Sequence, residues 1–263
     1  MSRYLKSLVG PLVVLFVLSV GFVQAADFGT LKGQIKYGGT PKVAEEIKPD
    51  KDVEVCGKNK IFREGLVVGK NGEVANVVIL LKNKAGEKLT VDPAVEKDIP
   101  KTVQLDNNGC RFTPHIAFVT TGQTLSITNS DTCGHNSKLS PFINPEANPT
   151  IGSKDKFDVT LTQPENLPFK VACGIHPWMA GWVVVRDNPF AVVTGDDGKF
   201  EIKGIPAGEY DFVFWQEQGG YLKEVEIGGK KVTLDKGKLK QKIAAGANDL
   251  GEIKADAKNF EGK

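Results

Sequence analysis

The feature that most constrains the fold of this sequence is a series of short runs rich in Val, Ile, Thr and aromatic residues. Several of these runs alternate polar and apolar residues, which is typical of a strand with one buried face. No run after residue 25 has the pattern of a convincing amphipathic helix, although residues 91–100 could form a helical turn. Short strands bounded by Gly, Pro, Asn and Asp predict an all-β protein built from sandwiches or barrels. The runs lie at residues 30–37, 75–82, 124–129, 157–162, 181–186, 199–205 and 209–215.

The N-terminal segment predicts export. Arg3 and Lys6 precede an apolar run from Leu8 to Val23, and small residues follow around Ala25. This is the order of a secretory signal peptide, so we expect cleavage after residue 25 and a periplasmic or secreted protein. An uncleaved membrane anchor is the alternative, but about 16 apolar residues are few beside the roughly 20 that span a bilayer. We therefore expect no stable membrane insertion.

The charge balance excludes one class of partner. The chain has 34 Lys and Arg and 32 Asp and Glu, and removal of Arg3 and Lys6 with the signal leaves 32 of each. A balanced chain gives no indication of nucleic acid as a partner. The sequence also lacks a Gly-rich phosphate loop, a GxSxG nucleophile elbow and an HExxH helix. The remaining residues with chemical potential are cysteine, histidine and methionine, which are soft or borderline metal ligands.

Three such ligands lie within seven residues. The stretch VACGIHPWMAGWVVV (171–185) places Cys173, His176 and Met179 directly before a predicted strand. One thiolate, two imidazoles and a weak axial thioether form the ligand set of a type 1, or blue, copper site. His135 supplies the second imidazole, because its segment TLSITNSDTCGHN follows a strand and can reach the same end of a sandwich. We predict one type 1 copper ion held by His135 and the three loop residues.

At these residues the sequence resembles the cupredoxins, in particular amicyanin- and pseudoazurin-like members, including those called methylamine-utilisation proteins. The resemblance rests on TGQTLSITNSDTCGHN (121–136) and PFKVACGIHPWMAGWVVV (168–185) and covers residues 106–187. It implies a Greek-key sandwich. It also implies that Asn136, which is not itself a metal ligand, supports the Cys173 thiolate from behind the ligands. Cys133 has no counterpart in the family pattern.

A second resemblance covers both ends of the chain. AVVTGDDGKFEIKGIPAGEYDFVFW (191–215) resembles the second half of the carboxypeptidase regulatory-like family, a small prealbumin-like β-sandwich. GTLKGQIKYGGTP (29–41) and NVVILLKN (76–83) resemble its first half. We therefore predict one sandwich, residues 27–105 and 188–254, interrupted by a cupredoxin domain, residues 106–187, with a flexible tail at 255–263. Three domains in a row and one extended cupredoxin remain alternatives.

The other cysteines and the third histidine leave choices open. In an exported protein, two of Cys56, Cys110 and Cys133 are expected to pair. We favour a Cys56–Cys110 disulfide, because both residues lie in turn-like contexts away from the copper loops, and a bridge through Cys133 is the alternative. His115 is either a hydrogen-bonded structural residue or a ligand of a second metal.

The ligand set predicts an electron carrier and not an enzyme. As a monomer it would pass single electrons between protein partners such as a cytochrome or a dehydrogenase. A ligand loop this short should leave the edge of His176 near the surface, ringed by a docking patch of Pro177, Trp178 and Gly181 together with Met179. Two other functions remain open: copper storage or delivery, and a non-redox module that binds carbohydrate or the cell envelope. Cys173 in a disulfide, with His176 on the surface and Met179 as core filler, is the alternative without a metal.

Overall fold

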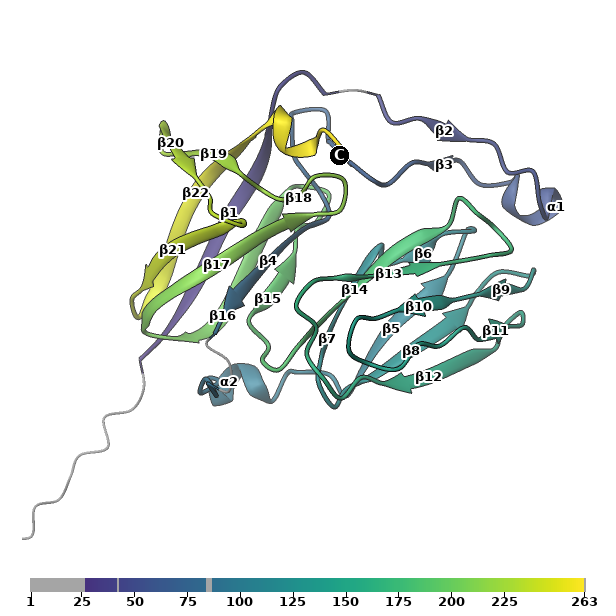
Figure 1. The fold of residues 1–263 in the computed structure, drawn as a ribbon, viewed down its shortest axis with the longest axis horizontal. Helices are drawn as coiled ribbons and strands as arrows, with labels where there is room; N and C mark the ends of the chain where they lie inside the picture. The colour runs from purple at the N-terminus through teal and green to yellow at the C-terminus, as the bar shows by residue number, and fades with distance from the viewer. Residues whose placement is uncertain (1–26, 42, 84–86, 263) are drawn as a thin grey trace, which may run out of the picture.

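A computed structural model describes residues 27–41, 43–83 and 87–262. The predicted signal peptide, residues 1–25, lies outside the described residues. The described strands form two β-sandwiches side by side (Figure 1). We call them the central sandwich, built from residues 102–186, and the terminal sandwich, built from strands near both ends of the chain. The prediction of an all-β protein is confirmed, and no helix in the described part is long and apolar enough to cross a membrane.

The central sandwich contains two four-stranded sheets. Their strand orders are β10-β13-β14-β7 and β12-β8-β5-β6, and β9 and β11 form a small separate pair. β5 pairs with β8 in parallel, as β14 does with β7. Their inward residues, such as Leu105, Leu125 and Val183, form one core. The bounds are β5 Thr102–Asn107, β6 Phe112–Thr113, β7 Ile116–Thr120, β8 Thr124–Asn129, β9 His135–Asn136, β10 Lys138–Ser140, β11 Thr150–Ile151, β12 Lys156–Thr160, β13 Phe169–Ala172 and β14 Ala180–Arg186.

The terminal sandwich joins the two ends of the chain. One sheet has the order β16-β1-β22-β19-β20, and the other has the order β15-β4-β17-β18 with β21 also paired to β17. β1 lies between β16 and β22, so a strand near residue 30 depends on partners near residues 200 and 250. The bounds are β1 Phe28–Gly38, β4 Val77–Lys82, β15 Ala191–Val193, β16 Lys199–Pro206, β17 Gly208–Gln216, β18 Gly220–Tyr221, β19 Glu224–Ile227, β20 Lys230–Thr233, β21 Lys238–Ile243 and β22 Gly246–Asp256.

Strands with two buried faces hold the sandwiches together. Successive side chains of a strand point to opposite faces, so a strand buried on both sides is a continuous apolar run. In β4, Ile79 and Leu81 join the core of the terminal sandwich, while Val78 and Leu80 join a second cluster with Val184 of β14. This interface cluster lies between the sandwiches and consists of Val78, Leu80, Ile116, Val184, Ala191, Val213 and Trp215.

A long connection between β1 and β4 reaches over the central sandwich (Figure 1). We call residues 46–62 of this connection the strap. It contains β2 Glu46–Ile47, the short helix α1 Val53–Cys56 and β3 Ile61–Phe62, and β2 pairs with β3. A disulfide between Cys56 and Cys110 fastens it to the loop after β5. Cys56 and Ile61 are buried in the core of the central sandwich, so the strap is part of that sandwich.

Two predicted boundaries need correction. The boundary between residues 105 and 106 falls inside β5, whose partners β6 and β8 both belong to the central sandwich. The tail predicted to be flexible from residue 255 is structured as far as it is described: β22 ends at Asp256, and a 3-10 turn follows at η1 Ala257–Phe260. Phe260 is buried against the core of the terminal sandwich, which explains this order. The helical turn expected within residues 91–100 is α2 Pro93–Glu96. The other domain boundaries stay predictions.

Candidate metal centre

Two connections at one end of the central sandwich carry the predicted ligands. His135 begins β9, and residues 173–179, the ligand loop, join β13 to β14. The loop is short because β13 and β14 pair up to Ala172 and Ala180. Two backbone hydrogen bonds close it, from the Cys173 N–H to the Met179 carbonyl at 3.1 Å and from the Met179 N–H to the His176 carbonyl at 2.9 Å. A rigid hairpin therefore fixes the ligand loop.

The structure brings three of the four predicted ligand side chains into one cluster. Ligand atoms of His135, Cys173 and His176 lie within 4.8 Å of one another. His176 Nδ1 is 3.7 Å from Cys173 Sγ, and the two imidazole ring centres are 4.6 Å apart. All three side chains are buried, and Met179, which is 2% exposed, belongs to the same core. The cluster contains one sulfur and two imidazoles that could hold a metal ion.

The environment of Cys173 favours the thiolate. Burial alone would raise the pKa of this thiol. The neighbouring His135 side chain and hydrogen bonds from the backbone N–H groups of Asn136 and His176 outweigh burial and lower the pKa of Cys173 to about 6. The sulfur is therefore mostly anionic at neutral pH, which is the form that binds metals.

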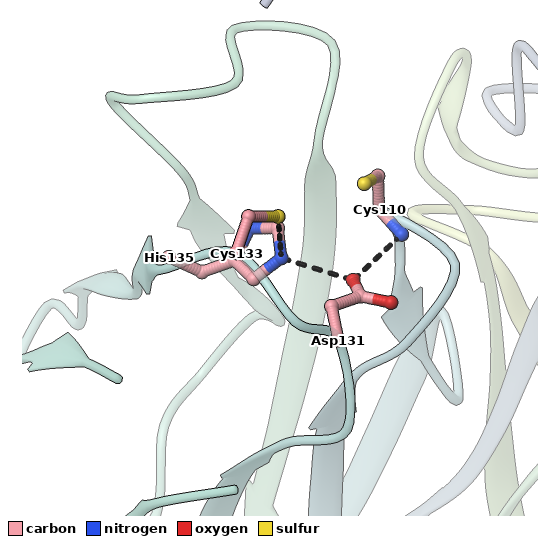
Figure 2. A group of neighbouring side chains, drawn as sticks. All are labelled: Cys110, Asp131, Cys133 and His135. Atoms are coloured by element: carbon pink, nitrogen blue, oxygen red, sulfur yellow. Dashed lines mark hydrogen bonds and ion pairs between the residues drawn. The ribbon is translucent and has the colours of Figure 1, made fainter. Parts of the chain in front are cut away.

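Asp131 orients the His135 ring (Figure 2). Nε2 of His135 is 2.9 Å from Asp131 Oδ2, and the same carboxylate accepts the N–H groups of Gly109 and Cys110. Nδ1 of His135 is buried and has no hydrogen-bond partner. A histidine that donates one ring N–H to a carboxylate and leaves the other nitrogen free has the arrangement of a metal ligand.

Ion pairing shifts the pKa values of this histidine and carboxylate in opposite directions. Burial lowers the pKa of His135, but Asp131 and the Cys173 sulfur raise it to about 9. Burial raises the pKa of Asp131, but His135 and the N–H groups of Cys110 and Gly109 lower it below its usual range. A positive charge is thus stabilised between Asp131 and Cys173. A metal cation could take the place of the proton that His135 carries there.

The strap orients the second imidazole. His176 Nε2 is 2.8 Å from Oδ2 of Asp52, the residue that precedes α1. The Asp52 side chain makes no capping hydrogen bond to its own helix. Its separation from His176 is 124 residues, so no local sequence pattern could reveal the pairing. Asp131, by contrast, lies only four residues before His135 and could have been found by looking for a carboxylate close in sequence.

The predicted exposure of His176 is wrong. Its side chain is 0% exposed, because the strap covers it and Asp52 binds its outer nitrogen. The predicted docking patch does not form one surface either. Pro177 is exposed, whereas Trp178 is half-buried and donates its indole N–H to the Cys110 carbonyl. Gly181 is buried, and a Cβ there would lie 2.9 Å from the His115 carbonyl oxygen.

Asn136 supports the ligand loop in two ways. Its backbone N–H is one of the groups that stabilise the Cys173 thiolate. Its side-chain oxygen accepts the Gly174 N–H at 2.7 Å and the Ile175 N–H at 3.2 Å. The residue that the cupredoxin pattern placed beside the thiolate therefore also holds the first turn of the loop.

Cys133 is a free, buried thiol beside these residues (Figure 2). Cys56 and Cys110 form the disulfide that the sequence favoured, so neither has a thiolate to offer a metal. The Cys133 sulfur is 3.5 Å from His135 Nε2. Burial, followed by the charges of Asp131 and Asp52, raises the pKa of Cys133 to about 11. Cys133 is therefore a neutral thiol at neutral pH, unlike Cys173.

His115 lies outside the cluster. Its Nε2 forms a short hydrogen bond with Glu217, and its Nδ1 is 3.6 Å from a Glu64 oxygen. No cysteine or second histidine is grouped with it among the described residues. These contacts match the structural alternative for His115. The ring is held between the carboxylates of Glu64, which follows the strap, and Glu217 of the terminal sandwich.

Comparison with known proteins gives only partial matches, all of them to solved structures. No family model and no curated protein matches the chain. Among solved structures it is similar to a purple cupredoxin from Nitrosopumilus maritimus, with 22% identity over 32% of this chain and 97% of that one, at a TM-score of 0.27. A mutant of amicyanin in the Cu(I) state matches with 18% identity over 41% and 98%, at a TM-score of 0.30.

A third similar structure is the Cu-containing nitrite reductase from Thermus scotoductus. It matches with 24% identity over 40% of this chain, at a TM-score of 0.30, and this chain spans 25% of its length. This match corrects the expectation that the protein is not an enzyme, since a protein named as one is among the similar structures. At these identities and TM-scores we take no residue role, subfamily or activity from any of the three proteins.

Proposed function

We propose that the protein binds one copper ion in a type 1 site and carries single electrons between redox proteins outside the cytoplasm. The ligands in this proposal are Cys173, His135 and His176, with Met179 as a weak axial ligand. The observation that carries this proposal is the buried cluster of one low-pKa thiol and two imidazoles. The Nε2 atom of each imidazole is hydrogen-bonded to a carboxylate.

The residues of this chain would keep the ligand cluster nearly unchanged between oxidation states. Asp131 and Asp52 fix the two rings, and backbone N–H groups of Asn136 and His176 hold the thiolate. Because these contacts are made by the protein's own groups, little has to rearrange when charge changes at the site. Copper bound here would supply one-electron redox chemistry, and the hydrogen bonds to the sulfur and the axial thioether would tune its potential.

In this proposal electrons do not pass through an exposed edge of His176, because that ring is buried. The ring of Trp178 lies 5.2 Å from the ring of His176, and Trp178 is only half-buried. Partners such as a cytochrome or a dehydrogenase would therefore approach Trp178 and Pro177, while the strap covers His176. The predicted signal peptide would place the protein in the periplasm or outside the cell, where such partners and the disulfide are expected together.

A visible spectrum during Cu(II) titration tests the proposal. We expect one copper ion per chain and an intense thiolate-to-copper absorption that disappears on reduction. Cys173→Ser should abolish the absorption and leave the far-UV circular dichroism unchanged. Cys133→Ser is the matched control, because Cys133 is also a free buried cysteine and should leave the absorption in place.

Three results would overturn the proposal. A wild-type protein that stays colourless at full Cu(II) occupancy has no type 1 site. A Cys173→Ser protein that keeps the colour assigns it to another sulfur. A site that takes up only Cu(I) and exchanges it rapidly with a chelator is a storage or delivery site instead.

A further inference from the structure

Cys133 is a free buried thiol that the ligand set of the candidate metal centre does not use. Its sulfur lies within 4.8 Å of the Cys56 sulfur and within 4.8 Å of the Cys110 sulfur. These two sulfurs are joined in the disulfide that fastens the strap. A free thiol therefore lies beside both ends of a disulfide, which is the arrangement from which thiol–disulfide exchange starts.

The loops that carry Cys110 and Cys133 are already tied together. They follow β5 and β8, two strands that pair in parallel. Asp131 of the second loop accepts the N–H groups of Gly109 at 2.8 Å and of Cys110 at 2.9 Å (Figure 2). The Asn129 side chain donates to the Cys133 carbonyl at 2.8 Å. A bond between Cys110 and Cys133 would thus join two neighbouring loops of one sheet, each already fixed by hydrogen bonds.

Cys56 belongs to a segment with a weaker attachment. The strap contains two strands of two residues and a helix of four, and most of its side chains are exposed. The contacts that would remain without the disulfide include the burial of Ile61 and the hydrogen bond between His176 and Asp52. Of the two sulfurs in the disulfide, that of Cys56 is therefore the one whose backbone can move away.

We propose that Cys133 exchanges with the Cys56–Cys110 disulfide and thereby releases the strap. The Cys133 sulfur attacks the Cys110 sulfur, and the Cys110–Cys133 bond forms as the Cys56–Cys110 bond breaks. The Cys56 sulfur leaves with the bonding electron pair and takes up a proton, which replaces the one that Cys133 loses. One disulfide and two free thiols, counting Cys173, exist before and after, so the exchange needs no oxidant or reductant.

Release of the strap opens the candidate metal centre. The strap covers His176, whose side chain is 0% exposed, and Asp52 of the strap is hydrogen-bonded to its Nε2. Once Cys56 is free, Asp52 can leave with the strap, and the imidazole becomes accessible from solvent. The exchange goes beyond the proposed electron-transfer function, because it assigns to Cys133 the control of access to the site and takes place without a bound metal.

Trapping of the released Cys56 with N-ethylmaleimide tests the exchange. The metal-free full-length protein is incubated with the maleimide in the absence of reductant, unfolded in acid and mapped by mass spectrometry without reduction. We expect a Cys110–Cys133 cross-linked peptide to appear in the same amount as labelled Cys56. Only a thiolate attacks a disulfide, and Cys133 is mostly a neutral thiol at neutral pH, so we expect this to take hours.

Two variants identify the attacking sulfur. Cys133→Ser removes it, so labelling of Cys56 should slow by at least about ten-fold. Cys173→Ser removes the other free buried cysteine, and labelling of Cys56 in the metal-free protein should continue at the wild-type rate. The cross-linked peptide of the wild-type chain tests the proposal even if Cys133→Ser does not fold.

Trypsin measures the release of the strap. Lys51 and Lys58 are cleavage sites within it. After the same maleimide treatment, cutting at these two lysines should be several-fold faster in the wild-type protein, where Cys56 is trapped, than in Cys133→Ser, where the Cys56–Cys110 bridge stays closed.

Each contrary result overturns the proposal. An intact Cys56–Cys110 bridge with the label on Cys133 alone would show that no exchange takes place. A Cys56–Cys133 bridge with the label on Cys110 would mean that the strap stays fastened. Wild-type labelling of Cys56 in Cys133→Ser would assign the opening to another group, and unchanged cutting by trypsin would show that the strap is held without the disulfide. Because the protein is metal-free, these results are independent of the copper spectrum that tests the proposed function.

Discussion

Two carboxylates that were not among the predicted ligands orient the imidazoles of the candidate metal centre. Asp131 is hydrogen-bonded to His135, and Asp52 is hydrogen-bonded to His176. Both bind Nε2, and both come from segments other than the ligand loop. The loop after β8 therefore orients the His135 ring and the strap orients the His176 ring, while the ligand loop carries Cys173, His176 and Met179.

At the scale of residues we expect Asp131→Asn to weaken copper binding by about 10- to 100-fold, as loss of a carboxylate behind a metal-bound histidine usually does. The replacement keeps the size of the side chain and removes the charge that orients His135. Competition with a chelator of known affinity measures the effect. Asp158→Asn, an exposed aspartate of the same sandwich, is the control. Equal affinities in the two variants would show that Asp131 has no such role.

The sequence revealed the ligand loop more readily than its supports. Cys173, His176 and Met179 lie within seven residues, so one local pattern indicates their chemistry. Asp52 could not be predicted, because an aspartate directly before a short helix is ordinarily explained as its cap. The burial of His176 was missed for the same reason: the residues that cover it are more than a hundred positions away.

Among the elements, the strap has the largest effect on the site. It has only two-residue strands and a four-residue helix, so it owes its place to the Cys56–Cys110 disulfide and to a few buried side chains. Nothing in its sequence alternates strongly enough to predict a strand. By contrast, β8, β14, β16 and β17 were predicted almost to the residue, because each has a long β-branched or aromatic run between turn residues.

At the same scale we expect the double change Cys56→Ser and Cys110→Ser to lower the free energy of unfolding by roughly 4 kcal/mol, from the entropy of an unclosed loop. The two cysteines are 54 positions apart. A loosened strap should also be cut faster by protease and should let a chelator remove copper faster. Cys133→Ser serves as the control. Unchanged copper removal in the double variant would mean that the strap does not restrict access to the site.

The loop after β10 is organised by a buried carboxylate. Glu165 is 2% exposed and accepts the N–H groups of Phe142, Ile143 and Asn144. Burial raises the pKa of Glu165, but the hydrogen bonds from Asn144, Ile143 and Phe142 lower it below its usual range. Its contribution to stability is therefore complete above about pH 4.5 and is lost as the pH falls through the lower folded value.

Glu165→Gln should destabilise the protein by about 1–3 kcal/mol at pH 7, and the difference from wild type should shrink as the pH falls below 4. Urea unfolding at pH 7 and pH 3.5 measures it. Glu146→Gln, an exposed glutamate of the same loop, should have no comparable effect at either pH. A pH-independent difference would mean that packing, not the charge of Glu165, accounts for the loss.

For the whole molecule, the contact between the sandwiches combines an apolar cluster with polar contacts, among them a polar bridge through Glu217. Glu217 of the terminal sandwich binds His115 and accepts the Trp182 indole N–H at 2.6 Å, and both of these residues belong to the central sandwich. The apolar runs of β4, β14 and β17 could be recognised in the sequence. The sequence did not indicate that the outer faces of these strands pack against each other. Which faces meet depends on the packing of two complete sandwiches, and a single sequence carries no local signal for it.

The polar bridge should make stability fall in mild alkali. The pKa of His115 is raised from 6.5 to about 9 by Glu217 and Glu64 against the effect of burial. Its contribution is complete below pH 6.5 and is lost as the pH rises through 9, on the order of 3 kcal/mol. Glu217→Gln should therefore be less stable than wild type at pH 6, with a smaller difference at pH 9.5.

Urea unfolding of the metal-free protein at these two pH values measures the difference. Glu209→Gln, an exposed change near the start of β17, is the control and should follow the wild-type curve. A difference that stays constant from pH 6 to pH 9.5 would show that the charge of His115 does not contribute.

The pairing of β1 with β16 and β22 has a consequence for the order in which the chain folds as it is synthesised. β1 appears first but has to wait for partners that follow it by more than 160 residues. The central sandwich lies wholly between them, and domains generally fold as units in the order of synthesis. We expect the central sandwich to fold while β1 has not yet paired with β16 and β22. A chaperone that holds β1 during this interval would protect the newly made protein from aggregation.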